Sequence, residues 1–214
     1  MNLYNDSKNI QMKTLGRFTL YFTVFTFITV AVELLLYRFG PIIVLRENGV
    51  VEWLEFLWLI LCSVFLFLAA RKTIDYAKLF SVLWLLPLIA AVRELDGITD
   101  KMFFHGSWIV PMVIITVVSV HRIVKNFNAL GPEALRFMKT QQVVFLGIGF
   151  FTVVVFAQIC GNQHVLKVSF REHYQRYIGR YIEEIIEFLG YIILVIGSID
   201  CYLQSGKSAE RQDL

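Results

Sequence analysis

Carboxylate side chains lie at the ends of long apolar segments in this sequence, where an unpaired charge is costly. A carboxylate in a membrane-spanning helix costs roughly 2.5 to 3.5 kcal/mol at the helix centre and less near the headgroups. Several such groups at one depth therefore call for a shared partner, such as an arginine, a metal ion or water. The acidic residues concerned are Glu33, Glu52, Glu55, Glu94, Asp96, Glu183, Glu184 and Glu187. Because oxygen donors suit Mg²⁺, Mn²⁺ or Ca²⁺, the set predicts a site for a divalent cation.

The sixth apolar segment opens with the densest group of acids. Glu183 and Glu187 are four residues apart, and Glu184 and Glu187 three apart, so a helix would present them on one face. At 1.5 Å per residue this ladder reaches about 9 Å into the membrane. The helix dipole accounts for Glu183 and Glu184 in the first turn, but it decays before Glu187.

The first two segments add carboxylates at comparable depth. Glu52 and Glu55 are three residues apart on one predicted helical face. Glu52 also suits a helix start, whereas Glu55 lies deeper. Glu33 comes four residues before Tyr37, near the outer end of the first segment.

Arginine and histidine accompany the acids at the end of the third segment. Arg93 directly precedes Glu94, and Asp96 follows. The arginine could satisfy these carboxylates by charge-assisted hydrogen bonds, with no metal. Alternatively, the two acids turn toward the bundle while Arg93 holds an anionic group such as a lipid phosphate. His105 is available as a ligand or proton carrier, unless it is only solvated; a histidine ligand would suit zinc or iron.

Composition defines the elements that must position these side chains. The 214 residues are 57% hydrophobic and include 19 phenylalanines, and the mean hydropathy is +0.64. Such a chain is predicted to be an integral membrane protein, because a soluble domain could not bury this much apolar surface. Each apolar run approaches the roughly 20 residues that cross a bilayer as a helix. The six predicted spans are 18–37, 51–70, 76–92, 107–124, 142–160 and 181–202.

The fold class predicted is therefore all-α, a polytopic bundle of six transmembrane helices. Because the connections are short, residues 1–214 are expected to form a single transmembrane domain, with a polar cytoplasmic tail at 203–214. Of the lysines and arginines, twelve would lie inside and eight outside if the N-terminus is cytoplasmic. The positive-inside rule then places both termini in the cytoplasm and the acidic groups at the outer face.

The segment 163–180, before the last span, mixes aromatic and cationic residues. It is typical of a short interfacial amphipathic helix whose cations meet anionic lipid headgroups, although a plain surface connection is the alternative. Arg176 and Arg180 would then help to position a phosphate-bearing lipid. The basic residues form no aromatic-interleaved stripe, so no nucleic-acid partner is expected.

Three short motifs stand at the ends of the predicted spans: Glu-Asn-Gly-Val-Val-Glu-Trp entering the second, Arg-Glu-Leu-Asp closing the third, and Glu-Glu-Ile-Ile-Glu-Phe opening the sixth. Together they resemble the motifs of a group of uncharacterised bacterial multi-pass inner-membrane proteins. The second motif of that group is often Gly-Glu-Glu-Ile-Ser-Trp, from which this chain departs. The resemblance implies shared acidic sites at the outer helix ends and a location in the bacterial inner membrane, but no particular reaction.

The function predicted from these features is that of a membrane enzyme, a metal-assisted hydrolase or transferase acting on a lipid or envelope substrate at the periplasmic face. The catalytic candidates are Glu55, Glu94 and Glu187. The candidate substrate-binding residues are Arg93, Arg176 and Arg180. The candidate ligands of a divalent metal ion are Glu33, Glu55, Asp96, His105, Glu184 and Glu187.

Two other classes of function remain open. A non-enzymatic sensor or assembly subunit would use acid–arginine pairs to fix the bundle, and a homo-oligomer or a membrane partner protein would be compatible with it. A transporter ranks third, because its site is expected near the midplane on broken helices, whereas these acids are off-centre.

Overall fold

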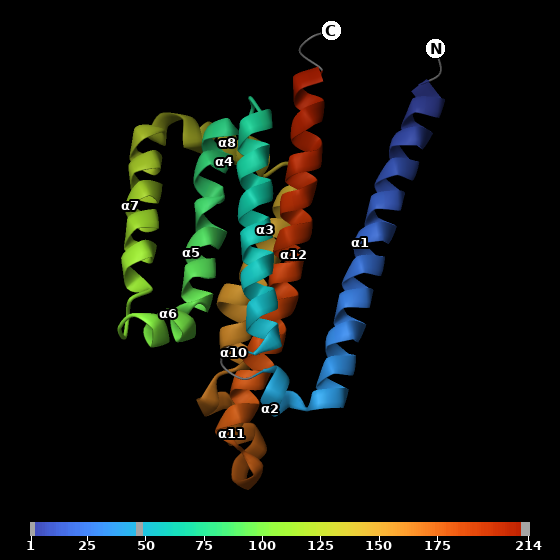
Figure 1. Ribbon diagram of the computed structural model, residues 1–214. Coiled ribbons are helices and arrows are strands. Elements are labelled where there is room, and N and C mark those ends of the chain that lie inside the picture. Colours follow the sequence, from blue (N-terminus) through green and yellow to red (C-terminus); the bar gives the residue numbers. More distant parts are fainter. Residues whose placement is uncertain (1–2, 46–48, 211–214) are drawn as a thin grey trace. The chain divides into compact units, whose positions relative to one another are not determined.

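The computed structural model of the chain, described for residues 3–45 and 49–210, consists of helices, with no strand among those residues (Figure 1). Side chains are described from Leu15 to Ser205, apart from those at 42, 46–48, 173 and 176. The prediction of an all-α fold is confirmed. Contacts divide the chain into two compact units, residues 1–44 and residues 45–214.

The first unit holds α1 (Leu3–Phe39) and the short α2 (Pro41–Val44). Gly40 joins them with a φ of 77°, a left-handed conformation that glycine adopts without strain. Glu33 lies on α1 and its side chain is exposed.

The second unit carries all the other acidic candidates. Its elements are α3 (Val50–Lys72), α4 (Ala77–Leu83), α5 (Leu85–Glu94), α6 (Asp96–Met102), α7 (Ile109–Lys125), α8 (Phe127–Phe137), α9 (Gln142–Phe151), the π-helix η1 (Thr152–Ala157), α10 (Gln158–Cys160), α11 (Gln163–Phe170), the 3₁₀ turn η2 (Arg171–His173) and α12 (Arg176–Glu210).

Four helical stretches within the described residues are long and apolar enough to cross a membrane: 15–39, 50–72, 142–160 and 177–205. A fifth is counted if α7 and α8, bent by 92° at Asn126, form one broken span. The predicted third span is divided at Trp84 into α4 and α5. Pro87 explains the break, since it has no N–H to bond the carbonyl of Leu83 one turn earlier. The structure thus supports four or five spanning helices, and six is not confirmed.

The last helix begins earlier and ends later than predicted. α12 starts at Arg176 and extends to Glu210, so it includes both the end of the expected amphipathic segment and much of the expected polar tail. The rest of that segment forms α11 and η2, on which Val165, Val168 and Phe170 are exposed. The interfacial position of this segment stays a prediction.

The core of the second unit is centred on α12, which packs against both α3 and α9. Its contact with α9 is close because glycines face each other there. A Cβ atom on Gly149 would lie 2.8 Å from Leu194 Cγ and 3.0 Å from the carbonyl oxygen of Gly190. Small residues let helix backbones approach in this way in membrane bundles.

This packing predicts opposite outcomes for two glycines of α9. Gly149→Ala should lower the free energy of unfolding by roughly 1–3 kcal/mol, because the new methyl group meets backbone atoms of α12. At Gly147 a Cβ meets nothing within 4 Å, so Gly147→Ala should be neutral or stabilising by up to about 1 kcal/mol. Thermal unfolding of the purified proteins in detergent measures both. Equal destabilisation by the two changes would contradict the close α9–α12 contact.

Candidate functional site

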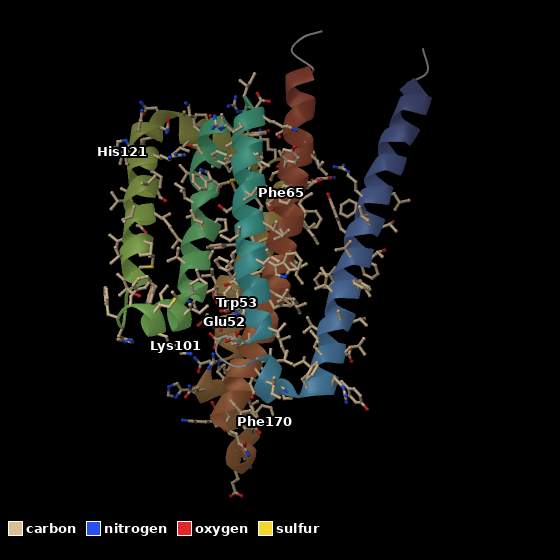
Figure 2. All side chains as sticks on the ribbon, viewed as in Figure 1. Glu52, Trp53, Phe65, Lys101, His121 and Phe170 are labelled. Carbon is tan, nitrogen blue, oxygen red and sulfur yellow. The ribbon has the colours of Figure 1, made fainter. Side chains whose placement is uncertain are left out.

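The ends of three helices bring the acidic residues of the second unit together. α3 packs against both α5 and α12, and the start of α3, the end of α5 and the start of α12 lie at the same end of this unit, the lower end in Figure 1. Figure 2 shows Glu52 and Trp53 at that end of α3. The acidic cluster is defined here as Glu52, Glu55, Glu94, Glu183, Glu184 and Glu187.

Glu55 is the most deeply buried member of the acidic cluster. Its side chain is 0% exposed, and neither carboxyl oxygen has a hydrogen-bond partner among the described residues. The carboxylates close enough to repel a charge on it belong to Glu184, Glu94, Glu187 and Glu52. A buried polar group without a partner costs on the order of 1–3 kcal/mol, and more when it is ionised. Glu55 is therefore an unsatisfied acceptor inside a group of like charges.

Glu187 and Glu183 share one donor on a neighbouring helix. The Gln158 amide donates from Nε2 to Glu183 Oε1 over 2.6 Å and to Glu187 Oε1 over 3.0 Å. The π-helix η1 directly precedes Gln158, and it packs on α12. Such π-turns recur at functional sites, where they change the direction of the following side chains. Here the amide reaches two successive carboxylates of the α12 ladder.

Tyr191 extends the ladder by one further turn and joins it to α5. Its hydroxyl donates to Glu94 Oε1 over 3.2 Å. Since Tyr191 follows Glu187 by four residues, the two side chains lie on the same face of α12. Glu94 also lines a small hollow together with Glu52, Trp53 and Ile98. Glu94 thus lies between the helix start of α3 and the ladder of α12.

Two arginines balance part of the negative charge. Arg180 Nε lies 3.4 Å from Glu184 Oε1, one turn along the same helix. Arg93 interacts electrostatically with Glu94, Glu187 and Glu183. The acidic cluster has six carboxylates, so these two cations leave a surplus of negative charge if all the carboxylates are ionised.

The other predicted site residues are exposed, belong to the first unit, or have side chains outside the described part of the structure. The His105 side chain is 98% exposed and its Nδ1 lies 2.6 Å from Asp100 Oδ2, in the α6–α7 connection. Asp96 is exposed at the start of α6, where its charge still acts on Glu94. Glu33 belongs to the first unit, and the side chain of Arg176 lies outside the described residues.

The cluster has the donor set for a hard cation but does not surround a common point. Among the described residues, no three Asp, Glu, His or Cys side chains are arranged to hold a metal ion. Glu94, Glu183 and Glu187 instead turn toward Tyr191 and Gln158. A cation that entered would have to draw these carboxylates away from their present donors.

Two polar members of the site, Gln158 and Tyr191, were not identified from the sequence. Gln158 is a lone amide near the end of an apolar run, and Tyr191 continues the spacing Glu183, Glu187 by four more residues. That continued spacing was a usable signal. Gln158 gave no such signal in the sequence, because the contact of its amide with α12 depends on how two helices cross.

Comparison with known proteins finds no matching family, no similar curated protein and no similar solved structure. The site is therefore interpreted from its own geometry.

The hydrogen bonding of the cluster predicts opposite effects on stability for two substitutions. In the presence of a metal chelator, Glu55→Met should raise the free energy of unfolding by roughly 1–3 kcal/mol, because it removes an unpaired buried carboxyl group. Tyr191→Phe should lower it by about 1 kcal/mol, since Glu94 loses its donor.

Thermal unfolding in detergent measures these changes, with Glu172→Gln on exposed η2 as the control expected within about 0.5 kcal/mol of the wild type. A destabilised Glu55→Met protein would show that the Glu55 carboxyl group has a stabilising partner.

Proposed function

We propose that the chain is a membrane-embedded enzyme, a metal-assisted hydrolase or transferase, whose acidic cluster binds one divalent cation. The observation that carries this proposal is the unpartnered carboxyl group of Glu55, fully buried beside the carboxylates of Glu94, Glu184 and Glu187. Ionisable groups retained inside apolar helix bundles despite their cost commonly serve function. A divalent cation would supply the positive charge that the cluster lacks.

The residues divide naturally into roles around such a cation. Glu55 and Glu187 would bind it, helped by Glu184, while Glu94 would accept the proton from a water or a substrate hydroxyl that acts as nucleophile. Arg93 would hold an anionic substrate group, because it borders the cluster without being fully enclosed. Asp96, at the exposed rim, would contribute only through its charge.

The substrate proposed is a lipid or envelope compound at the outer face of a bacterial inner membrane. The charge distribution of the loops supports cytoplasmic termini, which puts the acidic cluster on the periplasmic side. In this arrangement all six apolar segments cross the membrane, with α4 and α5 together forming one broken span. The segment α11–η2 would then lie at the interface, where Lys167 and Arg171 could contact anionic headgroups.

A second function, that of a non-enzymatic sensor or assembly subunit, is favoured by a specific set of contacts. Gln158, Tyr191 and Arg180 already pair with four carboxylates of the cluster, without any metal. In this alternative the pairs would fix the helix ends, and a change of protonation or a partner would alter them. Glu55 has no such pair within the described part of the chain, so the alternative leaves its position without a role.

Titration with Mn²⁺ distinguishes the two proposals. The purified full-length protein, first treated with chelator, should bind one Mn²⁺. Glu55→Gln and Glu187→Gln should each weaken this binding by roughly tenfold or more, which is the usual effect of changing a residue that holds a metal ion or its ligands. Electron paramagnetic resonance of free Mn²⁺ gives the affinity directly. The matched control is Glu172→Gln, which removes an exposed carboxylate outside the cluster.

The enzyme proposal fails if neither Mn²⁺, Mg²⁺ nor Ca²⁺ binds to the wild type more tightly than to the double variant Glu55→Gln/Glu187→Gln. If, in addition, both single variants unfold at lower temperature than the wild type in chelator, structural pairing is the better account of the cluster.

A further inference from the structure

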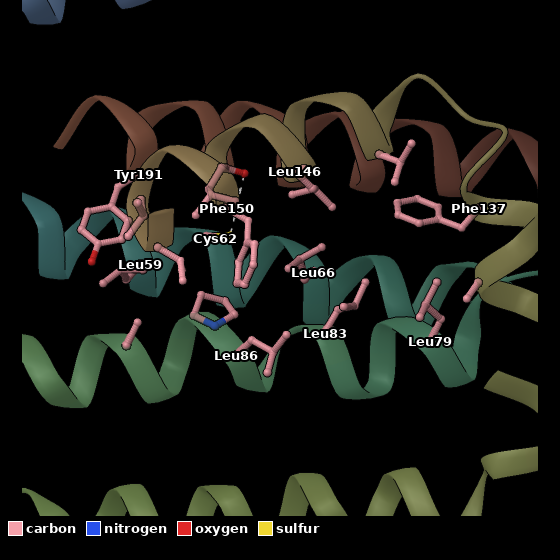
Figure 3. Close-up of a pocket in the computed structure, with 18 of the residues that line it drawn as sticks. Leu59, Cys62, Leu66, Leu79, Leu83, Leu86, Phe137, Leu146, Phe150 and Tyr191 are labelled. Atoms are coloured by element: carbon pink, nitrogen blue, oxygen red, sulfur yellow. Dashed lines mark hydrogen bonds between the residues drawn. The ribbon is translucent and has the colours of Figure 1, made fainter. Parts of the chain in front are cut away.

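An apolar cavity of about 440 Å³ lies beside the acidic cluster, within the second unit. Its walls come from α3, α4, α5, α8, α9, η1 and α12, and its volume is within the usual range for ligand sites. Figure 3 shows the lining side chains in a row, with Tyr191 at one end and Phe137 at the other. Nearly all of them are aliphatic or aromatic.

The cavity is a groove because it is open to the surface of the second unit. Leu86 and Phe150 line it and are also about half exposed, at 47% and 56%. In a membrane, such surface would face hydrocarbon rather than water. Gly147 lies on the same wall, where a Cβ atom would meet nothing within 4 Å. The groove is therefore accessible to a flexible apolar molecule from the lipid phase.

Tyr191 connects the groove to the acidic cluster. Its ring lines the apolar end, and its hydroxyl donates to Glu94 Oε1. From Leu79 to Ala90 the groove follows α4 and α5 for about 16 Å at 1.5 Å per residue. This is close to half of the roughly 30 Å hydrocarbon thickness, the depth of one leaflet. A molecule that filled it would have a linear apolar tail and a polar end beside Glu94.

We infer that the groove binds the single alkyl chain of an amphiphilic substrate, whose headgroup reaches the acidic cluster past Tyr191. This inference rests on the proposed function of the cluster and names its substrate class. The chain-binding groove fixes the depth of the headgroup, as remote binding contacts position a reacting group.

Photo-crosslinking tests the inference with a defined probe. The probe is a lysophosphatidic acid with a diazirine in its acyl chain, added to the full-length protein in phosphatidylcholine nanodiscs. Mass spectrometry of the peptides should find labels at Leu86 and Phe150 well above those at Val117 and Val120, exposed apolar residues of α7. Gly147→Phe should reduce groove labelling by roughly tenfold, the effect of losing about two buried methylene contacts.

The matched control is Ile148→Phe, which adds the same ring at the neighbouring exposed position outside the groove; it should label as the wild type does. Ala134→Phe fills the groove from α8 and gives a second test should Gly147→Phe fail to fold.

Groove labelling no stronger than that of α7 would overturn the inference and show only bulk lipid. The inference would also be overturned if groove labelling decreased as the concentration of protein in the membrane increased, because a second copy of the chain would then occupy the groove. The outcome is separable from the metal titration. If Mn²⁺ binds and the groove is not labelled, only the proposal of an alkyl-chain site is excluded. If the groove is labelled and no cation binds, only the proposal of a metal site is excluded.

Discussion

A carboxyl group inside an apolar helix bundle is costly unless it has a hydrogen-bond donor, a counter-charge or a bound ligand. The arrangement of the second unit depends on this requirement. Four acids of the cluster meet it through three sets of contacts. Glu183 and Glu187 share the Gln158 amide, Glu184 pairs with Arg180, and the Tyr191 hydroxyl links α12 to Glu94. The contacts of Gln158 and Tyr191 connect α12 to α10 and α5, so these hydrogen bonds both satisfy the carboxyl groups and hold the helix ends together.

The apolar packing around α12 makes these contacts possible. Gly149 and Gly190 let α9 approach α12 closely, and this approach aligns the following π-helix so that Gln158 faces the ladder. α3 carries Glu55 into the same region, where its carboxyl group has no hydrogen-bond partner among the described residues. The core therefore stabilises a polar arrangement that would be unfavourable in isolation. Natural proteins accept such local costs at functional sites, because function rather than maximal stability is selected.

The apolar groove and the acidic cluster meet at Tyr191, so this part of the structure presents an apolar surface next to a polar one. Tyr191 belongs to both, with its ring in the groove and its hydroxyl at Glu94. A water-soluble substrate would have no use for the groove, and a purely apolar one would have no use for the carboxylates. The amphiphilic substrate that we propose would contact both surfaces at once, so that the groove and the cluster would form two parts of one site.

The sequence by itself determined that the chain is helical and rich in segments able to enter a membrane, because hydropathy and segment length depend only on composition and order. It also marked Glu33, Glu55, Glu94 and Glu187 as costly positions, since depth along a helix can be counted from the spacing; of these, the side chain of Glu33 is exposed. It could not reveal the break at Trp84, the continuation of α12 from Arg176, or the exposed position of His105 beside Asp100. Only the tertiary structure decided which carboxylates accept a hydrogen bond, and that Glu55 accepts none from the described residues. The hydrogen bonds of Gln158 and Tyr191 to the acids depend on how closely and in what register separate helices cross.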